Sequence, residues 1–343
     1  MILRVGSLFS GIGGFDLAAE RSGLSVAWQV ECDAPACSLL QKHWPEVPRH
    51  GDIRTLNPAE LAPVDVICGG FPCQDVSRAG RRAGLAGARS GLFWEFIRVV
   101  AAVRPRWIVL ENVPGLLSSQ RGRDLGAILG AVGDLGYGWA YRVLDAQWAG
   151  VGQRRRRWLL VGCLGDPARA AEVLLEPEGV PGDPPARGGA AAAAQHRPTG
   201  RIGSHGVAGT LMASGAGLSR HAGMASEPDF LVPVSRTLTA RGQRNDFESE
   251  TFVTHTLTAE GADASEDGTG RGVPLTLSGT TVRRLTPREA ERLQGFPDDW
   301  TRWAASGREL ADTPRYRMVG NAVAVPVAQW IFSRIHSHKE EVV

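Results

Sequence analysis

The sequence predicts an α/β protein with a doubly wound, mostly parallel sheet and a smaller, irregular β-rich domain. Short apolar runs alternate with stretches of helical length and spacing through residues 1–165, which is typical of a parallel sheet flanked by helices. The composition then changes: residues 176–200 are rich in Pro, Gly and Ala, and residues 201–282 are rich in Gly, Thr and Ser. Helical character returns after Leu285, so we expect the end of the chain to complete the first domain.

Five apolar runs in the first domain have the length of buried strands, and the stretches between them are expected to be helices. Ligands of open parallel sheets bind outside the carboxyl ends of the strands. The residues directly after each run are therefore the first candidates for a site. The five predicted strands are Leu3–Phe9, Ser25–Val30, Val64–Cys68, Trp107–Leu110 and Trp158–Cys163.

The middle of the chain lacks this alternation. The composition of residues 176–200 indicates a linker or an insertion. Residues 201–282 contain a weak repeat of Thr and Leu, as at Thr237–Ala240, with Gly shortly after several copies. This pattern predicts short strands that end in turns, within a small β-rich module.

The last part of the chain carries signals for two helices. Thr286 followed by Pro287 and by Glu289 is typical of a capped helix start, and we expect that helix to run to about Gln294. A final helix is predicted from about Val323 to Ile335.

The composition excludes several classes of protein. Of 343 residues, 43% are hydrophobic and 22% are charged, which is typical of globular proteins. No run approaches the ~20 apolar residues of a membrane span, and the first residues lack the layout of a signal peptide. We therefore expect a cytoplasmic protein without a membrane partner.

The cysteines and the cations give further limits. Five scattered cysteines without a CxxC pair predict neither a disulfide framework nor a zinc site, so at least one is free for catalysis. A net charge of +2 does not by itself indicate nucleic-acid binding. Nearly every cation is arginine, because lysine occurs only at Lys42 and Lys339. Arginine side chains bind phosphates and guanine edges well. The codon usage of a GC-rich genome nevertheless explains most of this preference for arginine over lysine.

A glycine-rich turn, Phe9–Asp16, follows the first predicted strand and precedes a helical stretch. Glycine lets a ligand approach the main chain, and the helix start offers free N–H groups, although a tight turn alone also needs glycine. Glu31 and Asp52 follow later strand-like stretches. They are suited to bind a ribose diol and an adenine amino group, but carboxylates at strand ends are also common without any ligand.

A cysteine in a Gly/Pro loop follows the third predicted strand. The loop Gly69–Ser77 places Cys73 at the edge of the sheet where ligands bind, where a thiol can be exposed and activated. A buried loop cysteine is the alternative. The next residues, Arg78–Gly91, are rich in Gly and Arg, which predicts a loop that closes over a phosphate backbone.

Two further polar segments border the last two predicted strands. Glu111 follows Trp107–Leu110 and is expected at the same edge of the sheet. The run Gln153–Arg157 directly precedes a strand, so alternation would place Arg155 and Arg157 on one face. A solvated acid and a solvent-facing basic patch are the alternatives.

Together and in this order, these segments resemble the motifs of the bacterial DNA cytosine-5 methyltransferases. SLFSGIGGFDLA is similar to the cofactor motif of that family and GGFPCQDVS to its nucleophile motif. ENV and QRRRR resemble the motifs that hold the target base, and RRLTPREAERLQGFPDDW resembles the motif beside the recognition domain. The tail MVGNAV is similar to the last motif, which folds back beside the cofactor.

The resemblance implies a reaction and a set of roles. It implies the fold of S-adenosylmethionine-dependent methyltransferases, with transfer of the methyl group to carbon 5 of a cytosine flipped out of duplex DNA. Cys73 would attack carbon 6, Glu111 would hold N3 and the exocyclic amine, and Arg157, with Arg155 as a second candidate, would bind O2. No metal is implied. The cofactor residues would be Phe9, Gly11, Gly13, Glu31, Asp52, Pro72 and Asn321.

One position departs from the family pattern. Many relatives carry an aromatic residue after the acid of the second motif, stacked on the adenine. Cys32 stands at this position here, so the adenine must be stacked from elsewhere or bound more weakly.

The resemblance also implies a division of the chain. Residues 1–165 would form the catalytic domain, completed by residues 310–340, and residues 166–300 would form the target-recognition domain, including the linker at 176–200. A monomer is expected. Three roles share this chemistry: the partner of a restriction endonuclease, a phage protein that shields its genome, and a solitary methylase.

Two rival functions remain at this point. An RNA cytosine methyltransferase would carry similar catalytic motifs, although the long interval 201–282 favours a DNA-reading module. A DNA-binding protein with an inactive methylase core would not need Cys73, Glu111 and the two arginines together.

Overall fold

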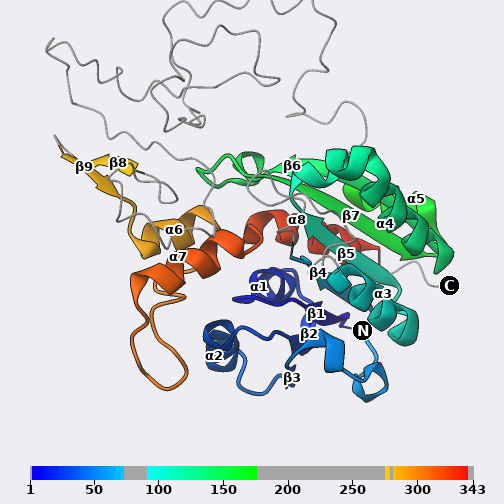
Figure 1. The fold of residues 1–343 in the computed structure, drawn as a ribbon, viewed down its shortest axis with the longest axis horizontal. Coiled ribbons are helices and arrows are strands. Elements are labelled where there is room, and N and C mark those ends of the chain that lie inside the picture. The colour runs from blue at the N-terminus through cyan, green and yellow to red at the C-terminus, as the bar shows by residue number, and fades with distance from the viewer. Residues whose placement is uncertain (1, 73–90, 176–274, 279–280, 339–343) are drawn as a thin grey trace, which may run out of the picture.

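The computed structural model describes residues 2–72, 91–175, 275–278 and 281–338. It confirms the predicted fold class, since the protein is built on a seven-stranded, mostly parallel sheet (Figure 1). The strands are β1 (Arg4–Leu8), β2 (Ser25–Val30), β3 (Arg49–His50), β4 (Val66–Gly69), β5 (Trp107–Asn112), β6 (Tyr137–Asp145) and β7 (Arg156–Leu164).

The order of the strands is β3-β2-β1-β4-β5-β7-β6. The pairs from β3 to β5 are parallel, whereas β7 runs antiparallel to both of its neighbours. The chain moves outward from β1 to β3 and then returns to β4, which lies on the other side of β1. The switch point of this doubly wound sheet therefore lies between β1 and β4.

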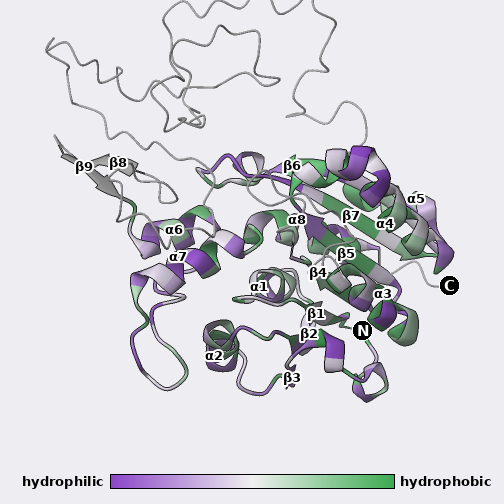
Figure 2. Ribbon diagram, in the orientation of Figure 1, coloured by the Kyte–Doolittle hydropathy of each residue, from purple (hydrophilic) through white to green (hydrophobic). Residues whose placement is uncertain are grey.

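Helices cover both faces of the sheet, and consecutive strand residues point to opposite cores. In β5, Trp107 and Val109 join the core that contains α1, α2, α5 and α8, whereas Ile108 and Leu110 join the core of α3 and α4. Figure 2 shows the resulting apolar centre along β5 and β7. The helices are α1 (Gly14–Arg21), α2 (Ala34–His43), α3 (Gly91–Val103), α4 (Arg123–Asp134), α5 (Pro167–Leu174), α6 (Pro287–Leu293), α7 (Asp312–Asn321) and α8 (Val325–Ser337).

All five predicted strands are confirmed, with ends that differ by a few residues. The prediction of helices in all stretches between them is wrong for residues 137–145, which form β6. This strand lies at the edge of the sheet and is half-buried along most of its length, so its sequence lacks a clear alternation. Gly138 lets α5 pack closely, because a Cβ there would lie 2.2 Å from the Pro167 nitrogen.

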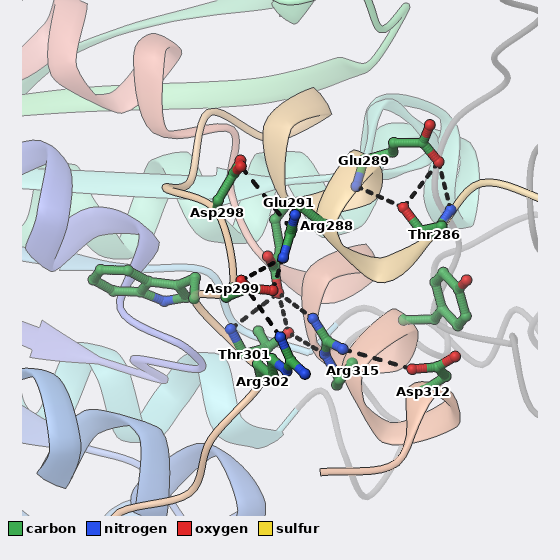
Figure 3. Close-up of polar contacts among 12 residues, drawn as sticks. Thr286, Arg288, Glu289, Glu291, Asp298, Asp299, Thr301, Arg302, Asp312 and Arg315 are labelled. Carbon is green, nitrogen blue, oxygen red and sulfur yellow. Dashed lines mark hydrogen bonds and ion pairs between the residues drawn. The ribbon is translucent and has the colours of Figure 1, made fainter. Parts of the chain in front are cut away.

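The C-terminal helices return to the N-terminal ones. The helix predicted after Thr286 is confirmed as α6, with Thr286 and Glu289 forming a reciprocal capping box (Figure 3). The predicted last helix is confirmed as α8, which packs against α1 (Figure 1). Helix α7 was not predicted, although it carries Asn321 at its end.

A buried ionic cluster joins α6 to α7 (Figure 3). The Glu291 carboxylate is fully buried, lies 3.1 Å from Arg315 Nη2 and accepts a hydrogen bond from the Thr301 main-chain N–H at 3.0 Å. Arg315 Nε also donates to Thr301 Oγ1. The cluster fixes the segment between the two helices, where Trp300 Nε1 donates to the Ile12 carbonyl in the glycine-rich turn.

The β-rich module predicted at 201–282 lies mostly outside the described residues. Its last Thr/Leu copy falls in β8 (Leu275–Ser278), which pairs antiparallel with β9 (Thr281–Arg284). No helix in the described part of the chain is both long and apolar enough to cross a membrane.

Candidate active site

Two of the predicted segments meet at the switch point. Strands β1 and β4 are neighbours, with Leu8 opposite Gly69 in the register. The glycine-rich turn leaves β1 at Phe9, and the loop that leads to Cys73 leaves β4 at Gly70. Both segments therefore start side by side at the carboxyl edge of the sheet, although Cys73 itself lies outside the described residues.

The glycine-rich turn is a left-handed main-chain path. Phe9, Gly11 and Gly13 have φ values of 54°, 56° and 81°. A Cβ on Gly13 would lie 2.3 Å from the Trp44 ring, so packing alone requires glycine there. At Gly11, in contrast, nothing among the described atoms lies within 4 Å of an added Cβ. The main chain at Gly11 therefore has open space beside it, as a bound cofactor needs.

The Glu31 carboxylate binds the main chain next to this open space. Its Oε2 accepts a hydrogen bond from the Gly11 N–H at 2.7 Å, and its Oε1 accepts from the N–H groups of Cys32 and Asp33 at 2.8 Å each. The carboxylate thus joins the first turn to the end of β2. An acceptor held this rigidly, half-buried beside a glycine with open space, fits the ribose hydroxyls of a nucleoside.

Asp52 lies after β3 and binds Arg54. Its carboxylate accepts from the Arg54 guanidinium, with the shortest contact at 2.5 Å, and from the Arg54 main-chain N–H at 3.0 Å. These hydrogen bonds lower the pKa of Asp52 below its ordinary value. Cys32 is exposed for most of its surface. Partial burial of its thiol, together with the neighbouring carboxylates of Glu31 and Asp52, raises the pKa of that thiol.

The loop after β4 is held in place by Asn112. This side chain is buried and its Nδ2 donates to the Phe71 carbonyl at 3.2 Å. Pro72 follows as an exposed residue. Asn112 therefore fixes the main chain two residues before Cys73, a contact that the sequence motif alone did not reveal.

Glu111 and Arg157 meet beside this loop. Arg157 Nε lies 2.9 Å from Glu111 Oε1, and both side chains are largely buried, at 16% and 12% exposure. A Cβ on Gly70 would lie only 2.9 Å from Glu111 Oε2. The carboxylate therefore occupies the space next to Gly70, three residues before the predicted nucleophile.

Arg155 has different neighbours from Arg157. Its side chain is only 2% exposed, and its Nη2 donates to the carbonyls of Gly320 and Ala322. Burial lowers the pKa of Arg155 well below its ordinary value; the Arg157 charge lowers it further and Glu111 opposes this. Burial alternates from Gln153 to Arg156, because Gln153 and Arg155 are buried while Arg154 and Arg156 are only partly buried. Arg157 is also partly buried, so the alternation in burial does not extend to it.

The structure thus brings the predicted residues into two neighbouring groups. Glu31 and the glycine-rich turn form one, and Glu111 with Arg157 forms the other. Asn321 lies at the end of α7 as an exposed residue between the carbonyls that Arg155 holds. In the described part of the chain, no three His, Cys, Asp or Glu side chains are grouped so that they could hold a metal ion.

The strand order and the position of the glycine-rich turn define the class of protein. A doubly wound sheet with an antiparallel β7 between β5 and β6, and with a glycine-rich turn after β1, is the fold of S-adenosylmethionine-dependent methyltransferases. The sequence comparisons narrow the class further. The family model of the C-5 cytosine-specific DNA methylases matches residues 3–179 and 213–337. The chain therefore belongs to this family, whose members methylate carbon 5 of cytosine in DNA.

Individual relatives match over nearly the whole chain. The type II methyltransferase M2.BsuMI of Bacillus subtilis (strain 168) is 31% identical, over 98% of this chain and 76% of its own length. M.Bsp6I of Bacillus sp. (strain RFL6) is 29% identical, over 98% of this chain and 99% of its own. The solved structure of the Entamoeba histolytica methyltransferase EhMeth shares the fold, with a TM-score of 0.62, 14% identity and 98% coverage of both chains.

Proposed function

We propose that this DNA cytosine-5 methyltransferase acts through Cys73, Glu111 and Arg157 on a cytosine flipped out of the duplex. One observation carries the proposal. The Glu111–Arg157 pair lies beside Gly70, at the start of the loop that leads to Cys73. A carboxylate and a guanidinium side by side match the edge of cytosine, which offers the O2 acceptor next to N3 and the exocyclic amine.

The residues divide the chemistry between them. The Cys73 thiolate adds to carbon 6, which makes carbon 5 nucleophilic. Arg157 donates to O2, and Glu111 accepts from the exocyclic amine and favours protonation of N3 as electrons move into the ring. After carbon 5 has gained its methyl group, it loses its proton, the electron pair re-forms the double bond, and Cys73 leaves as the thiolate.

The cofactor residues support this assignment. S-adenosylmethionine supplies an electrophilic methyl group when it is bound. Glu31 would accept hydrogen bonds from its ribose hydroxyls, and Gly11 would let it approach the main chain. Asp52, carrying a negative charge beside Arg54, would accept from the adenine amine. Phe9, Gly13, Pro72 and Asn321 complete the proposed set, and no metal takes part.

The rest of the chain is assigned by the same reasoning. Residues 1–165 with 310–340 would form the catalytic domain, and residues 166–300 would read the DNA sequence. The named relatives are type II methyltransferases, which favours a role beside a restriction endonuclease. We further propose a monomer that works in the cytoplasm.

Duplex DNA with 5-fluorocytosine at the methylated position tests the mechanism. The fluorine cannot leave as the proton does, so the adduct with Cys73 should persist and shift the protein in denaturing electrophoresis. Cys73→Ala should abolish both adduct and methylation, whereas Cys163→Ala, a buried cysteine of β7, should retain them. Full activity of Cys73→Ala would refute the covalent mechanism.

A parallel assay separates the two nucleic-acid substrates. Labelled methyl groups should appear in duplex DNA and not in tRNA when both are offered at equal concentration. Transfer mainly to tRNA would replace the DNA assignment for this chain.

A further inference from the structure

Arg155 makes a buried contact that the proposed mechanism does not use. This arginine precedes β7, and its guanidinium is buried against the junction of α7 and α8. Nη2 lies 2.9 Å from the Gly320 carbonyl and 2.8 Å from the Ala322 carbonyl. One nitrogen therefore binds the main chain on both sides of Asn321.

The contact has a clear physical role at the end of α7. The last carbonyls of a helix lack partners within the helix, and a cation near them interacts favourably with the helix dipole. Only three residues separate the two helices here, because α7 ends at Asn321 and α8 begins at Val325. A guanidinium that holds two carbonyls flanking one residue fixes the direction of that residue.

The same turn is held from its other side by Gln294. This buried side chain donates from Nε2 to the Val319 carbonyl at 3.1 Å, and the Val325 N–H donates to the Gln294 carbonyl at 2.8 Å. The turn that carries Asn321 is thus anchored to α6 through Gln294 and to β7 through Arg155. Of these two anchors, Arg155 directly precedes the strand that carries Arg157, the residue proposed to bind the base.

We propose that Arg155 is a positioning residue that holds Asn321 toward S-adenosylmethionine, and that Arg157 alone of the two binds the base. The inference rests on the proposed role of Asn321 in cofactor binding. Arg157 pairs with Glu111 at 2.9 Å, while two hydrogen bonds of Arg155 go to the α7–α8 turn. Two arginines of one motif, two residues apart, thereby serve the two different substrates.

The test compares Arg155→Met with Arg157→Met in the full chain. Calorimetric titration with S-adenosylmethionine alone should show at least tenfold weaker binding for Arg155→Met and a change below twofold for Arg157→Met. With 5-fluorocytosine DNA and saturating cofactor, Arg155→Met should still form the adduct, whereas Arg157→Met should not. Arg155→Lys keeps a buried donor and should fall between the wild type and Arg155→Met.

A control variant, Arg315→Met, separates the positioning role of Arg155 from general destabilisation. Arg315 is a second buried arginine, on α7, bound to Glu291 and Thr301. Arg315→Met should lower the melting temperature, yet below that temperature it should bind the cofactor within twofold of the wild type. If Arg155→Met does not fold, Arg155→Lys decides, since its cofactor affinity should still fall severalfold.

Unchanged cofactor affinity in a folded Arg155 variant would overturn the inference. Asn321→Ala tests the assumption beneath it. If Asn321→Ala binds S-adenosylmethionine as the wild type does, the proposed cofactor role of Asn321 fails. Loss of the adduct in Cys73→Ala remains a separate test of the mechanism, so the failures are distinguishable.

Discussion

At the residue scale, Gly70 makes room for Glu111. The carboxylate fills the space that a side chain on Gly70 would need. The adjacent Phe71 carbonyl accepts a hydrogen bond from Asn112, so the main chain at Phe71 is held in place. A Cβ at position 70 would come within 2.9 Å of Glu111 Oε2, so the present position of the carboxylate requires glycine directly before Phe71.

Replacing Gly70 with Ala should therefore displace the Glu111 carboxylate. Because misplacement by about 1 Å can cost 100-fold in rate, we expect a loss in kcat of roughly that size with a nearly unchanged melting temperature. Steady-state methylation at saturating DNA and cofactor measures it. Gly126→Ala in α4, where nothing among the described atoms lies within 4 Å of the added Cβ, is the matched control and should keep full activity. Equal activity of both variants would show that Glu111 is not held by Gly70.

At the element scale, Asp16 ties α1 to two strands. Its carboxylate accepts from Ser7 Oγ of β1 at 3.0 Å and from Gln29 Nε2 of β2 at 2.9 Å. Burial raises the pKa of Asp16 to about 6, although these hydrogen bonds oppose the shift. The folded protein therefore binds the Asp16 proton more tightly than the unfolded chain does.

The raised pKa predicts a pH dependence of stability. Below about pH 4 both states hold the proton, so the contribution is fully present there. It is lost as the pH rises to about 6, because the unfolded chain releases the proton first. A pKa raised from 3.8 to about 6 corresponds to roughly 3 kcal/mol in the free energy of unfolding. Urea unfolding of wild type and Asp16→Asn at pH 4 and pH 7 measures it, and a stability difference that is equal at both pH values would contradict the prediction.

The ionic cluster between α6 and α7 gives a second prediction at this scale. Removing Arg315 leaves the fully buried Glu291 without its cation, which costs about 3–5 kcal/mol. Arg315→Met should lose that much in urea unfolding, and adding Glu291→Met should restore most of it, since the buried charge is then gone. A double variant as unstable as the single one would mean that packing, and not charge, dominates.

At the scale of the whole molecule, the two ends of the described chain pack against each other. Helix α8 packs on α1, and Trp300 donates to Ile12, 288 residues away. These contacts place the end of α7 beside the first turn of the chain. The proposed cofactor residues from both ends can therefore act together.

Binding of DNA also belongs to this scale, and here the expectation falls on residues outside the described ones. If the Arg78–Arg89 loop contacts phosphates, Arg82→Ala should weaken binding to all sequences alike and reduce the salt slope of log K by about 1. Binding titrations from 50 to 300 mM salt measure the slope. Lys42→Ala, an exposed cation of α2, is the control, and an unchanged slope for Arg82→Ala excludes a phosphate role.

Local patterns were enough to predict much of the molecule. Strands that are buried on both faces need continuous apolar runs, whether parallel or, like β7, antiparallel, so all five predicted strands were found. The capping box at Thr286 is formed by side chains three residues apart, so the start of α6 could also be predicted. Edge strand β6 and the short helix α7 carry weaker local signals, and neither was predicted.

The sequence by itself determined the family, the fold class and the residue types of the site, because these depend on motifs that are contiguous in the chain. Only the tertiary structure decided how the two arginines differ, placing Arg157 beside Glu111 and Arg155 against the carbonyls around Asn321. Alternation along a strand predicts which residues share a face, but it says nothing about which distant segment packs there. That choice depends on contacts between residues more than 160 positions apart, which form only when the chain ends meet.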